Sequence, residues 1–263
     1  MENFLARSFR ISSFDTDPLG RARLTTLAGF FQEMAYLHAG GLGFGYRDLE
    51  QKNSFWVLSR IKIGIDRYPF WDEEVMVETW HNGVERLFGL REFRVFDRDE
   101  HPVARATSAW LILDAKTRRP LRPDENLLNA GTGRGFLFEG RPERIDIPGN
   151  AGLLSTRRVA YSDLDIMGHV NNVKYMEWCI DLCMETSDPA GPGLGIQELE
   201  INYKGEARQG DSVEILGSRG QLPDGSGGAG KIFFLARDGT SGKEIFRAGV
   251  LFGPSGRGGP GSR

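Results

Sequence analysis

Apolar residues follow two different spacings along this chain, and the alternation between them outlines its elements. Between residues 27 and 41 they recur every three or four positions, which predicts an α-helix with one buried face and an N-cap at Thr25 or Thr26. From residue 57 to residue 65 apolar and polar positions alternate, which is typical of a half-buried strand. The same criteria predict further strands in this half at residues 6–14, 74–80, 88–96 and 103–113.

A similar succession begins again after residue 152. The pattern predicts a helix at residues 171–186 and strands at 155–161, 196–204, 212–218, 231–237 and 244–252. The interval 122–152, rich in Pro, Gly and charge, is expected to be a linker with one short element. We therefore predict an N-terminal domain at 1–140, a C-terminal domain at 141–253 and a disordered tail at 254–263.

The two halves share local motifs as well as element order. Residues 15–21 align with residues 163–169, which places Asp17 opposite Asp165 at an offset of 148 residues. Residues 71–75 align with 209–213 at an offset of 138 residues, so the second copy has a helix-to-strand connection ten residues shorter. This is an internal repeat, and each copy is expected to be a helix laid against a curling antiparallel sheet.

The best candidate for chemistry is a short turn in the second copy. Asp165, Gly168 and His169 fall within five positions, and Asn171 and Asn172 follow where the predicted helix begins. A carboxylate and an imidazole thus stand beside a helix N-terminus, whose free N–H groups can hold a polarised oxygen. The alternative is that these side chains only cap and satisfy a turn.

The first copy lacks the acid–base residues at the corresponding positions. Arg21 stands opposite His169, and Tyr68 stands opposite Glu206. An arginine cannot act as an acid or a base near neutral pH, so we predict one catalytic turn, with the first half supplying structure and a ligand-binding wall. The alternative for Glu206 is an exposed charge at a strand end.

Composition narrows the class of protein. The 263 residues are 40% apolar and 26% charged with a net charge of −3, typical of a soluble globular protein without the basic excess of a nucleic-acid binder. Cys179 and Cys183 are expected to be small core residues, and the four histidines are too scattered to predict a metal site. With no signal peptide and no apolar run of membrane-spanning length, we expect a cytoplasmic protein without cofactor, metal, nucleic-acid or membrane partner.

Two blocks of sequence carry a family resemblance. The run 163–178, with Asp163-Leu164-Asp165 and Gly168-His169-Val170-Asn171-Asn172-Val173-Lys174-Tyr175 followed by Trp178, resembles the signature of acyl-acyl-carrier-protein thioesterases. In the first half, residues 56–60 and 66–80 are similar to that family's amino-terminal half. The likeness extends over residues 6–252.

This resemblance implies an α+β tandem double hotdog, in which two antiparallel sheets each wrap a long helix. It also implies hydrolysis of the thioester of fatty acyl-acyl carrier protein, with release of a free fatty acid. The family's catalytic Asp, His and Glu map onto Asp165, His169 and Glu206, whereas its Asn falls on Met167. A thioether donates no hydrogen bond, so Asn171, Asn172 or N–H groups of the turn are the candidates to replace that amide.

Several assignments remain open at this point. Glu206 with His169 is expected to activate water, while Asp165 either orients the histidine or acts itself as base or nucleophile. Phe30, Phe31 and Met34 are expected to line an acyl tunnel, with ordinary core packing as the alternative.

Two other functions compete with the first. One is an acyl-CoA thioesterase of the same fold, and the other is a non-catalytic acyl-binding regulator. The expected partner is an acidic acyl carrier protein that carries a fatty acyl chain, and its docking patch draws on Arg157, Arg158, Lys174 and Arg208. A homodimer is left open.

Overall fold

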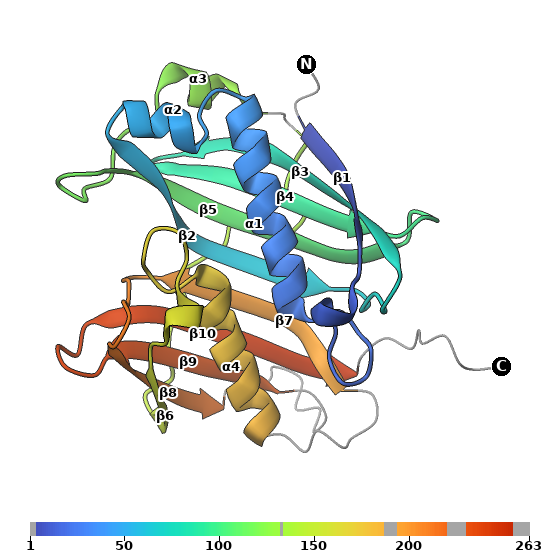
Figure 1. Cartoon of the computed structure of the whole chain (residues 1–263), viewed down its shortest axis with the longest axis vertical. Helices are drawn as coiled ribbons and strands as arrows, with labels where there is room; N and C mark the ends of the chain where they lie inside the picture. Colours follow the sequence, from blue (N-terminus) through green and yellow to red (C-terminus); the bar gives the residue numbers. More distant parts are fainter. Residues whose placement is uncertain (1–3, 132–133, 187–193, 220–229, 255–263) are drawn as a thin grey trace. The chain divides into compact units, whose positions relative to one another are not determined.

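The computed structural model describes residues 4–131, 134–186, 194–219 and 230–254. Its contacts divide the chain into two compact units, Met1–Pro142 and Glu143–Arg257. Each unit is built from one antiparallel sheet and one long helix (Figure 1).

The N-terminal unit contains five strands in the spatial order β1-β3-β4-β5-β2. A 3₁₀ turn, η1 (Ser13–Asp15), leads from the first strand to α1. The strands are β1 (Phe4–Arg10), β2 (Ser54–Ile65), β3 (Glu74–Glu85), β4 (Phe88–Phe96) and β5 (Pro102–Asp114), and the helices are α1 (Leu24–Gly41), α2 (Tyr46–Gln51) and α3 (Glu125–Asn129).

The C-terminal unit repeats this arrangement. Its strands follow the order β6-β8-β9-β10-β7, which is the order of the first unit element for element. They are β6 (Gly152–Arg158), β7 (Leu194–Tyr203), β8 (Ser212–Arg219), β9 (Lys231–Asp238) and β10 (Glu244–Pro254), with η2 (Tyr161–Asp163) and α4 (Asn172–Thr186) between the first two. The predicted internal repeat and the double-hotdog class are confirmed by this topology.

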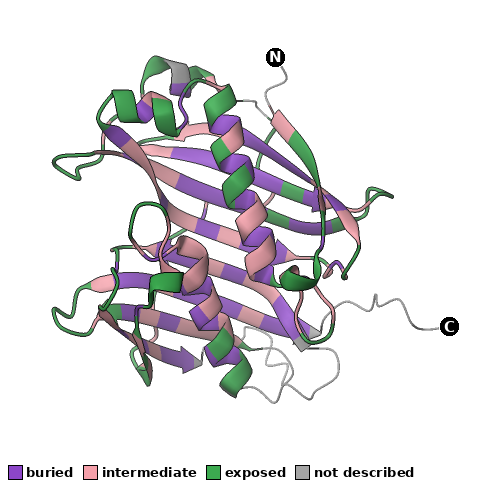
Figure 2. Ribbon diagram, in the orientation of Figure 1, coloured by how far each residue is buried: buried purple, intermediate pink, exposed green. Residues whose placement is uncertain are grey.

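Each long helix buries one face against its own sheet (Figure 2). In α1 the buried positions include Leu27, Phe31, Met34 and His38, at helical spacing, and the Phe31 ring packs on Phe93 of β4 with centroids 4.9 Å apart. In α4 the buried face includes Met176 and Cys179. Nonpolar burial between helix and sheet therefore supplies the core of each unit.

The structure corrects three boundaries predicted from sequence. Helix α1 begins at Leu24, because Arg23 is its N-cap residue and the Thr26 hydroxyl donates to the Asp15 carbonyl at 3.0 Å instead of capping. The first strand ends at Arg10 and gives way to η1. The segment between the predicted helix and the strand predicted at 57–65, for which no element was predicted, contains α2, whose Leu49 packs with Ala39, Phe44, Ile112 and Leu127.

The predicted linker contains α3 as its one helix among the described residues, and its later part lies on the sheet of the N-terminal unit. The Leu137 N–H donates to the carboxylate of Glu92 at 3.1 Å, and the Phe138 ring lies close to Gly64 and under the Lys62 ammonium. All but the first residue of the tail expected at 254–263 lies outside the described residues. None of the described helices combines the length and the apolar character of a bilayer-spanning segment.

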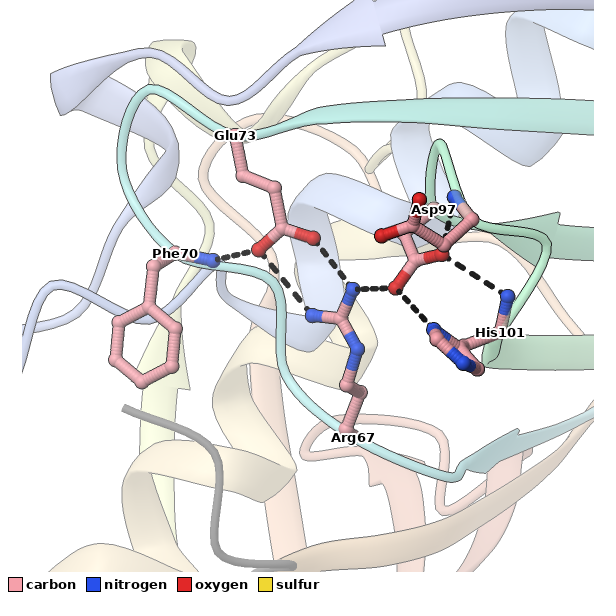
Figure 3. A network of polar contacts seen from close by, with 6 residues as sticks. Arg67, Phe70, Glu73, Asp97 and His101 are labelled. Atoms are coloured by element: carbon pink, nitrogen blue, oxygen red, sulfur yellow. Dashed lines mark hydrogen bonds and ion pairs between the residues drawn. The ribbon is translucent and has the colours of Figure 1, made fainter. Parts of the chain in front are cut away.

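An ion-pair network joins two turns at one end of the N-terminal sheet (Figure 3). The Arg67 guanidinium donates to both oxygens of Glu73, at 3.2 and 2.5 Å, and to Asp97 at 2.7 Å. Asp97 also lies near Asp99 and His101, and one ligand atom from each of these three residues falls within 4.8 Å of the others. Because Arg67 already neutralises Asp97, this grouping is explained as a structural clamp.

Candidate active site

The catalytic turn predicted from sequence is a tight hydrogen-bonded loop between η2 and α4. The Asp165 N–H donates to the His169 carbonyl at 2.9 Å, and the Gly168 N–H donates to the Asp165 carbonyl at 3.0 Å. One carboxylate oxygen of Asp165 accepts the Met167 N–H at 2.8 Å. Gly168 has φ of +73°, a left-handed conformation that glycine adopts without strain. The backbone thus fixes where His169 leaves the turn.

Two further backbone bonds attach this turn to the rest of the unit. The Val170 N–H donates to the Ala207 carbonyl at 2.9 Å, and the Asn171 N–H donates to the Asp163 carbonyl at 2.9 Å. The first of these joins the turn to the segment that follows β7. Glu206 precedes Ala207 directly, so this bond brings its carboxylate to the turn.

His169 and Glu206 meet as the resemblance implies. The His169 Nε2 atom lies 3.3 Å from a carboxylate oxygen of Glu206, with the side chains 13% and 38% exposed. The pair is an ion pair when the imidazole is protonated, although the contact lacks hydrogen-bond alignment and Nε2 has no hydrogen-bond partner among the described residues. A half-buried imidazole beside a carboxylate that water can reach is suited to proton transfer.

The carboxylate of Asp165 takes a different position. Within the described part of the chain its side chain hydrogen-bonds only to the Met167 N–H and forms no hydrogen bond or ion pair with the His169 ring. The geometry therefore gives Asp165 a turn-shaping bond and pairs Glu206 with the histidine.

Helix α4 presents a backbone donor at the same place. The Val173 N–H donates to the Asn171 side-chain oxygen at 2.9 Å, and the Lys174 N–H donates to the Asn171 carbonyl at 2.9 Å. Asn171 is thus the cap of the helix, and its amide oxygen is already engaged. The N–H of Asn172 has no acceptor among the described residues and remains available at the positive end of the helix dipole.

Two tyrosines that the sequence analysis did not single out support this arrangement. The Tyr175 hydroxyl, 2% exposed as a residue, accepts the Ala207 N–H at 3.1 Å, next to Glu206. The Tyr203 hydroxyl donates to the Asn172 carbonyl at 3.0 Å. Burial raises the pKa of both hydroxyls, so both stay protonated. Tyr175 lies in the run 163–178 that carries the family resemblance, and this position was the one feature of the sequence that could have pointed to it.

Of the remaining predicted site residues, Met167 lies on this turn, whereas Phe30, Phe31 and Met34 lie in α1. Met167 is 46% exposed on the turn itself. Phe31 and Met34 are fully buried in α1 of the other unit, and Phe30 stacks on Phe9 with centroids 4.3 Å apart. These contacts are those of helix–sheet packing, and a role in holding an acyl chain stays a prediction.

The first unit contains the same turn with different side chains. Arg21 donates from Nε to the Asp17 carboxylate at 2.9 Å, its Nη2 lies 2.8 Å from the same oxygen, and its guanidinium lies 5.3 Å from the Tyr68 ring centroid. The backbone bonds match those of the second unit: Asp17 N–H to the Arg21 carbonyl at 2.7 Å, and Ala22 N–H to the Pro69 carbonyl at 2.7 Å. The acid–base pair is replaced by an ion pair.

The predicted carrier-docking patch is partly neutralised. Arg157 lies 3.6 Å from Asp181, and Lys174 donates to Glu177 at 3.0 Å. Arg158 and Arg208 are exposed, and their side chains form no ion pair with any described residue. The uncompensated cations of the patch are therefore Arg158 and Arg208.

The fold and the turn define a double-hotdog protein with a His–Glu pair of the thioesterase type. Two family models match the chain: the acyl-ACP thioesterase N-terminal domain over residues 2–130 and the acyl-ACP thioesterase C-terminal domain over residues 150–249. The chain belongs to the acyl-ACP thioesterase family.

Individual relatives agree with this placement. The chain is 29% identical to the chloroplastic oleoyl-acyl carrier protein thioesterase 1 of Arabidopsis thaliana, over 95% of this chain and 75% of that protein. It is 30% identical to the chloroplastic palmitoyl-acyl carrier protein thioesterase of Gossypium hirsutum, over 68% of this chain but only 46% of the relative. The crystal structure of an acyl-ACP thioesterase from Bacteroides thetaiotaomicron superposes with a TM-score of 0.84 at 28% identity, covering 95% of this chain and 98% of the other.

Proposed function

We propose that this protein hydrolyses the thioester of fatty acyl-acyl carrier protein and releases a free fatty acid. The observation that carries the proposal is the His169–Glu206 pair, 3.3 Å apart, in which His169 stands on the turn before α4 and Glu206 follows β7. Membership of the thioesterase family supports the same activity.

The mechanism follows from the positions of these groups. Glu206 accepts a proton from water, and the water oxygen attacks the thioester carbonyl carbon. The N–H of Asn172 donates to the oxygen that becomes negative in the tetrahedral intermediate. When the carbon–sulfur bond breaks, His169 gives a proton to the leaving thiolate, and Glu206 passes the proton it took from water to His169, 3.3 Å away, which restores both groups. Water is thus divided between the fatty acid and the carrier's thiol.

Asp165 acts in this proposal as a positioning residue. Its carboxylate oxygen holds the Met167 N–H at 2.8 Å, which keeps the turn closed and aims His169 at Glu206. The pairing of His169 with Glu206 supports Glu206 as the base, and Asp165 as base or nucleophile is the alternative that the mutations below separate.

The backbone offers a substitute for the amide that the family carries at the position of Met167. Since the Asn171 side chain is engaged as the helix cap, the Asn172 N–H and side chain are the remaining donors at this point. We infer that Asn172 takes that role.

The acyl carrier protein is the partner in this proposal. Exposed Arg158 precedes the catalytic turn, exposed Arg208 follows Glu206 by two residues, and both supply the positive charge that an acidic carrier needs. We keep Phe30, Phe31 and Met34 as the proposed acyl-binding residues of the N-terminal unit, and a reducing cytoplasm as the proposed location, in agreement with the free, buried Cys179 and Cys183.

A panel of acyl thioesters on carrier protein and on CoA, with acyl chains of about 8 to 18 carbons, tests the activity. Release of free thiol is followed with purified protein. We expect carrier-bound substrates to have the higher kcat/KM. Faster hydrolysis of the CoA esters identifies the alternative, an acyl-CoA thioesterase, and hydrolysis of neither with binding of both identifies a non-catalytic acyl-binding protein.

Three variants test the site on the best substrate of that panel. His169→Ala and Glu206→Gln are each expected to lower kcat by about 10²-fold or more, because each removes one proton-transfer group. Asp165→Asn keeps one oxygen for the Met167 N–H and is expected to lower kcat less than Glu206→Gln does. The matched control is Glu185→Gln, a carboxylate of the same unit whose oxygen lies 4.0 Å from Arg157. A larger loss in Asp165→Asn than in Glu206→Gln identifies Asp165 as the base.

A further inference from the structure

A buried cationic cluster lies between α1 and the sheet of the N-terminal unit, and the mechanism above does not use it. Its members are Arg91 on β4, His81 on β3 and His38 on α1, which are 5%, 3% and 6% exposed. Arg91 and His81 are paired residues in the β3–β4 ladder and so share one face of the sheet. Phe93, two residues along β4 from Arg91, packs on Phe31 of α1.

The hydrogen bonds of the cluster fix its proton positions. The Arg91 Nη1 donates to His38 Nδ1 at 2.8 Å and to the Thr79 hydroxyl oxygen at 3.2 Å. Because arginine has no acceptor, His38 Nδ1 is the acceptor, and a neutral His38 ring must carry its hydrogen on Nε2. That Nε2–H is buried and has no partner within the described residues.

The cluster also carries a positive charge without a counter-ion. Burial lowers the pKa of Arg91 to about 9, which leaves its guanidinium charged at neutral pH. Burial and the neighbouring Arg91 lower the pKa values of His38 and His81 to about 3 and about 4, so both rings are neutral. Of the carboxylates in the described residues, none forms an ion pair with Arg91, and the adjacent Glu92 binds Thr107 and Leu137 instead.

Such a cluster needs an acceptor from outside the chain. An unpaired buried charge is unfavourable, and a well-placed anion with good hydrogen-bond geometry offsets part of that cost. The groups that remain, the Nε and Nη2 of Arg91 and the Nε2–H of His38, are all donors, and a carboxylate is the acceptor that suits a guanidinium best. Met34 and Phe31, one and two turns before His38 on the same helix face, provide apolar side chains beside it.

We propose that Arg91 and His38 bind the carboxylate of an apolar, carboxyl-terminated chain in the N-terminal unit. Two sources offer this chemistry: a free fatty acid, or an acyl group whose far end carries a second carboxyl. The free fatty acid is the product of the hydrolysis proposed above. A role for it as a feedback inhibitor therefore rests on that proposed function, whereas its binding at Arg91 and His38 does not.

Binding is measured by calorimetric titration of decanoate and decan-1-ol into the full-length protein with His169→Ala in the background, which prevents turnover. We expect decanoate to bind about tenfold more tightly than decanol, because only the carboxylate neutralises Arg91. Arg91→Met should remove this preference and leave decanol unchanged. The matched control, Arg94→Met, alters an exposed arginine on the same strand that pairs with Glu78, and should change neither affinity.

The outcomes are separated as follows. Equal affinities for decanoate and decanol, or a preference that survives Arg91→Met, overturn the proposal. If Arg91→Met does not fold, His38→Leu removes the Nε2–H together with the Nδ1 that accepts from Arg91, leaves the guanidinium in place, and should weaken decanoate binding by about threefold or more. A decanoate affinity that is unchanged in that variant overturns the proposal as well.

Kinetics on the protein with His169 intact then identify the source. Inhibition by decanoate that disappears in Arg91→Met identifies the product, whereas a higher kcat/KM for the carrier thioester of decanedioic acid than for that of decanoic acid identifies the substrate. If decanoate binding depends on Arg91 but no thioester is hydrolysed, the binding site is supported and the proposed hydrolase function is contradicted.

Discussion

At the scale of residues, the same backbone turn carries an acid–base pair in one unit and an ion pair in the other. In the second unit the His169 Nε2 atom has no hydrogen-bond partner among the described residues and lies 3.3 Å from the Glu206 carboxylate. In the first, Arg21 is held by Asp17 at 2.9 Å. The side chains differ, but the bonds that shape the turn come from the backbone and from the aspartate. Function and turn stability are therefore separable residue by residue.

Gly168→Ala tests the backbone requirement of the catalytic turn. A Cβ at this position meets nothing within 4 Å, so the whole cost comes from φ of +73°. We expect the free energy of unfolding to fall by about 1 kcal/mol in urea titrations. Gly29→Ala, in α1 with equally open space, is the matched control and should raise it by roughly 0.5 to 1 kcal/mol. Equal effects of the two changes contradict this account.

The buried carboxyl of Glu92 makes the stability of the fold depend on pH in a predictable direction. Burial raises its pKa to about 7, against hydrogen bonds from Thr107, Leu137 and Asn82 that favour the ionised form. The native state then holds a proton between pH 4.5 and 7 that the unfolded state has released, so stability falls as pH rises across this window.

Glu92→Gln removes that proton linkage. The unfolding free energy of the variant relative to the wild type should therefore increase by up to about 3 kcal/mol between pH 4 and pH 8. Taking the difference between the two proteins cancels the histidines, whose lowered pKa values act in the opposite direction. If the difference in unfolding free energy between Glu92→Gln and the wild type does not change with pH, Glu92 is not the group that takes up the proton.

At the scale of elements, hydrogen-bonded loops rather than helix caps set several boundaries. Alternation and helical spacing located every strand and both long helices, because each buries one face. The start of α1 was wrong, since Thr26 bonds across to Asp15. Helix α2 was missed because it is only six residues long, and Leu49 gains its partners from α3 and β5, distant in sequence. The pattern within one segment cannot report such contacts.

The clamp around Arg67 is an element-scale device, because it joins the β2–β3 turn to the β4–β5 turn. Burial opposes ionisation of Asp97, but hydrogen bonds from Arg67, His101 and Asp99 lower its pKa to about 2. A depressed carboxyl pKa stabilises the fold above pH 3.8, and this stability is lost as pH falls through 2.

Arg67→Met should lower the unfolding free energy at pH 7 by about 2 kcal/mol, because it leaves Glu73 and Asp97 facing each other. The loss should shrink as the pH falls toward 2. Arg98→Met, which removes the exposed partner of Glu74, is the control and should lower the unfolding free energy much less, because solvent screens this pair. Urea titrations at both pH values measure the two variants, and equal losses argue against the clamp.

At the scale of the whole molecule, the chain is a duplication in which the units have taken different roles. The repeat was predictable because its two motifs stand at fixed offsets. The pairing of His169 with Glu206 was implied by the family resemblance, whereas the supporting hydroxyls of Tyr175 and Tyr203 were not found from sequence. Their partners are main-chain groups 31 and 32 residues away, and a carbonyl or N–H leaves no trace in the identity of a residue.

A crossed pair of variants tests this division of roles. Arg21→Ala should lower stability by about 1 to 2 kcal/mol through loss of the half-buried Asp17 ion pair and the Tyr68 contact, with kcat unchanged. His169→Ala should leave stability within about 1 kcal/mol while lowering kcat. Thermal unfolding and thiol release are measured on both proteins. Loss of kcat in Arg21→Ala would show that the first turn also takes part in the reaction.

The matched backbone bonds of the two turns have a consequence for how such a chain can change. Asp17 and Asp165 hold their loops through main-chain donors, so the loop geometry persists whichever residue occupies the position of Arg21 or His169. New chemistry can therefore be introduced in one unit while the other continues to work. The double substitution Arg21→His with Tyr68→Glu would place the residue types of the His169–Glu206 pair on the first turn as well, with the backbone bonds of that turn unchanged.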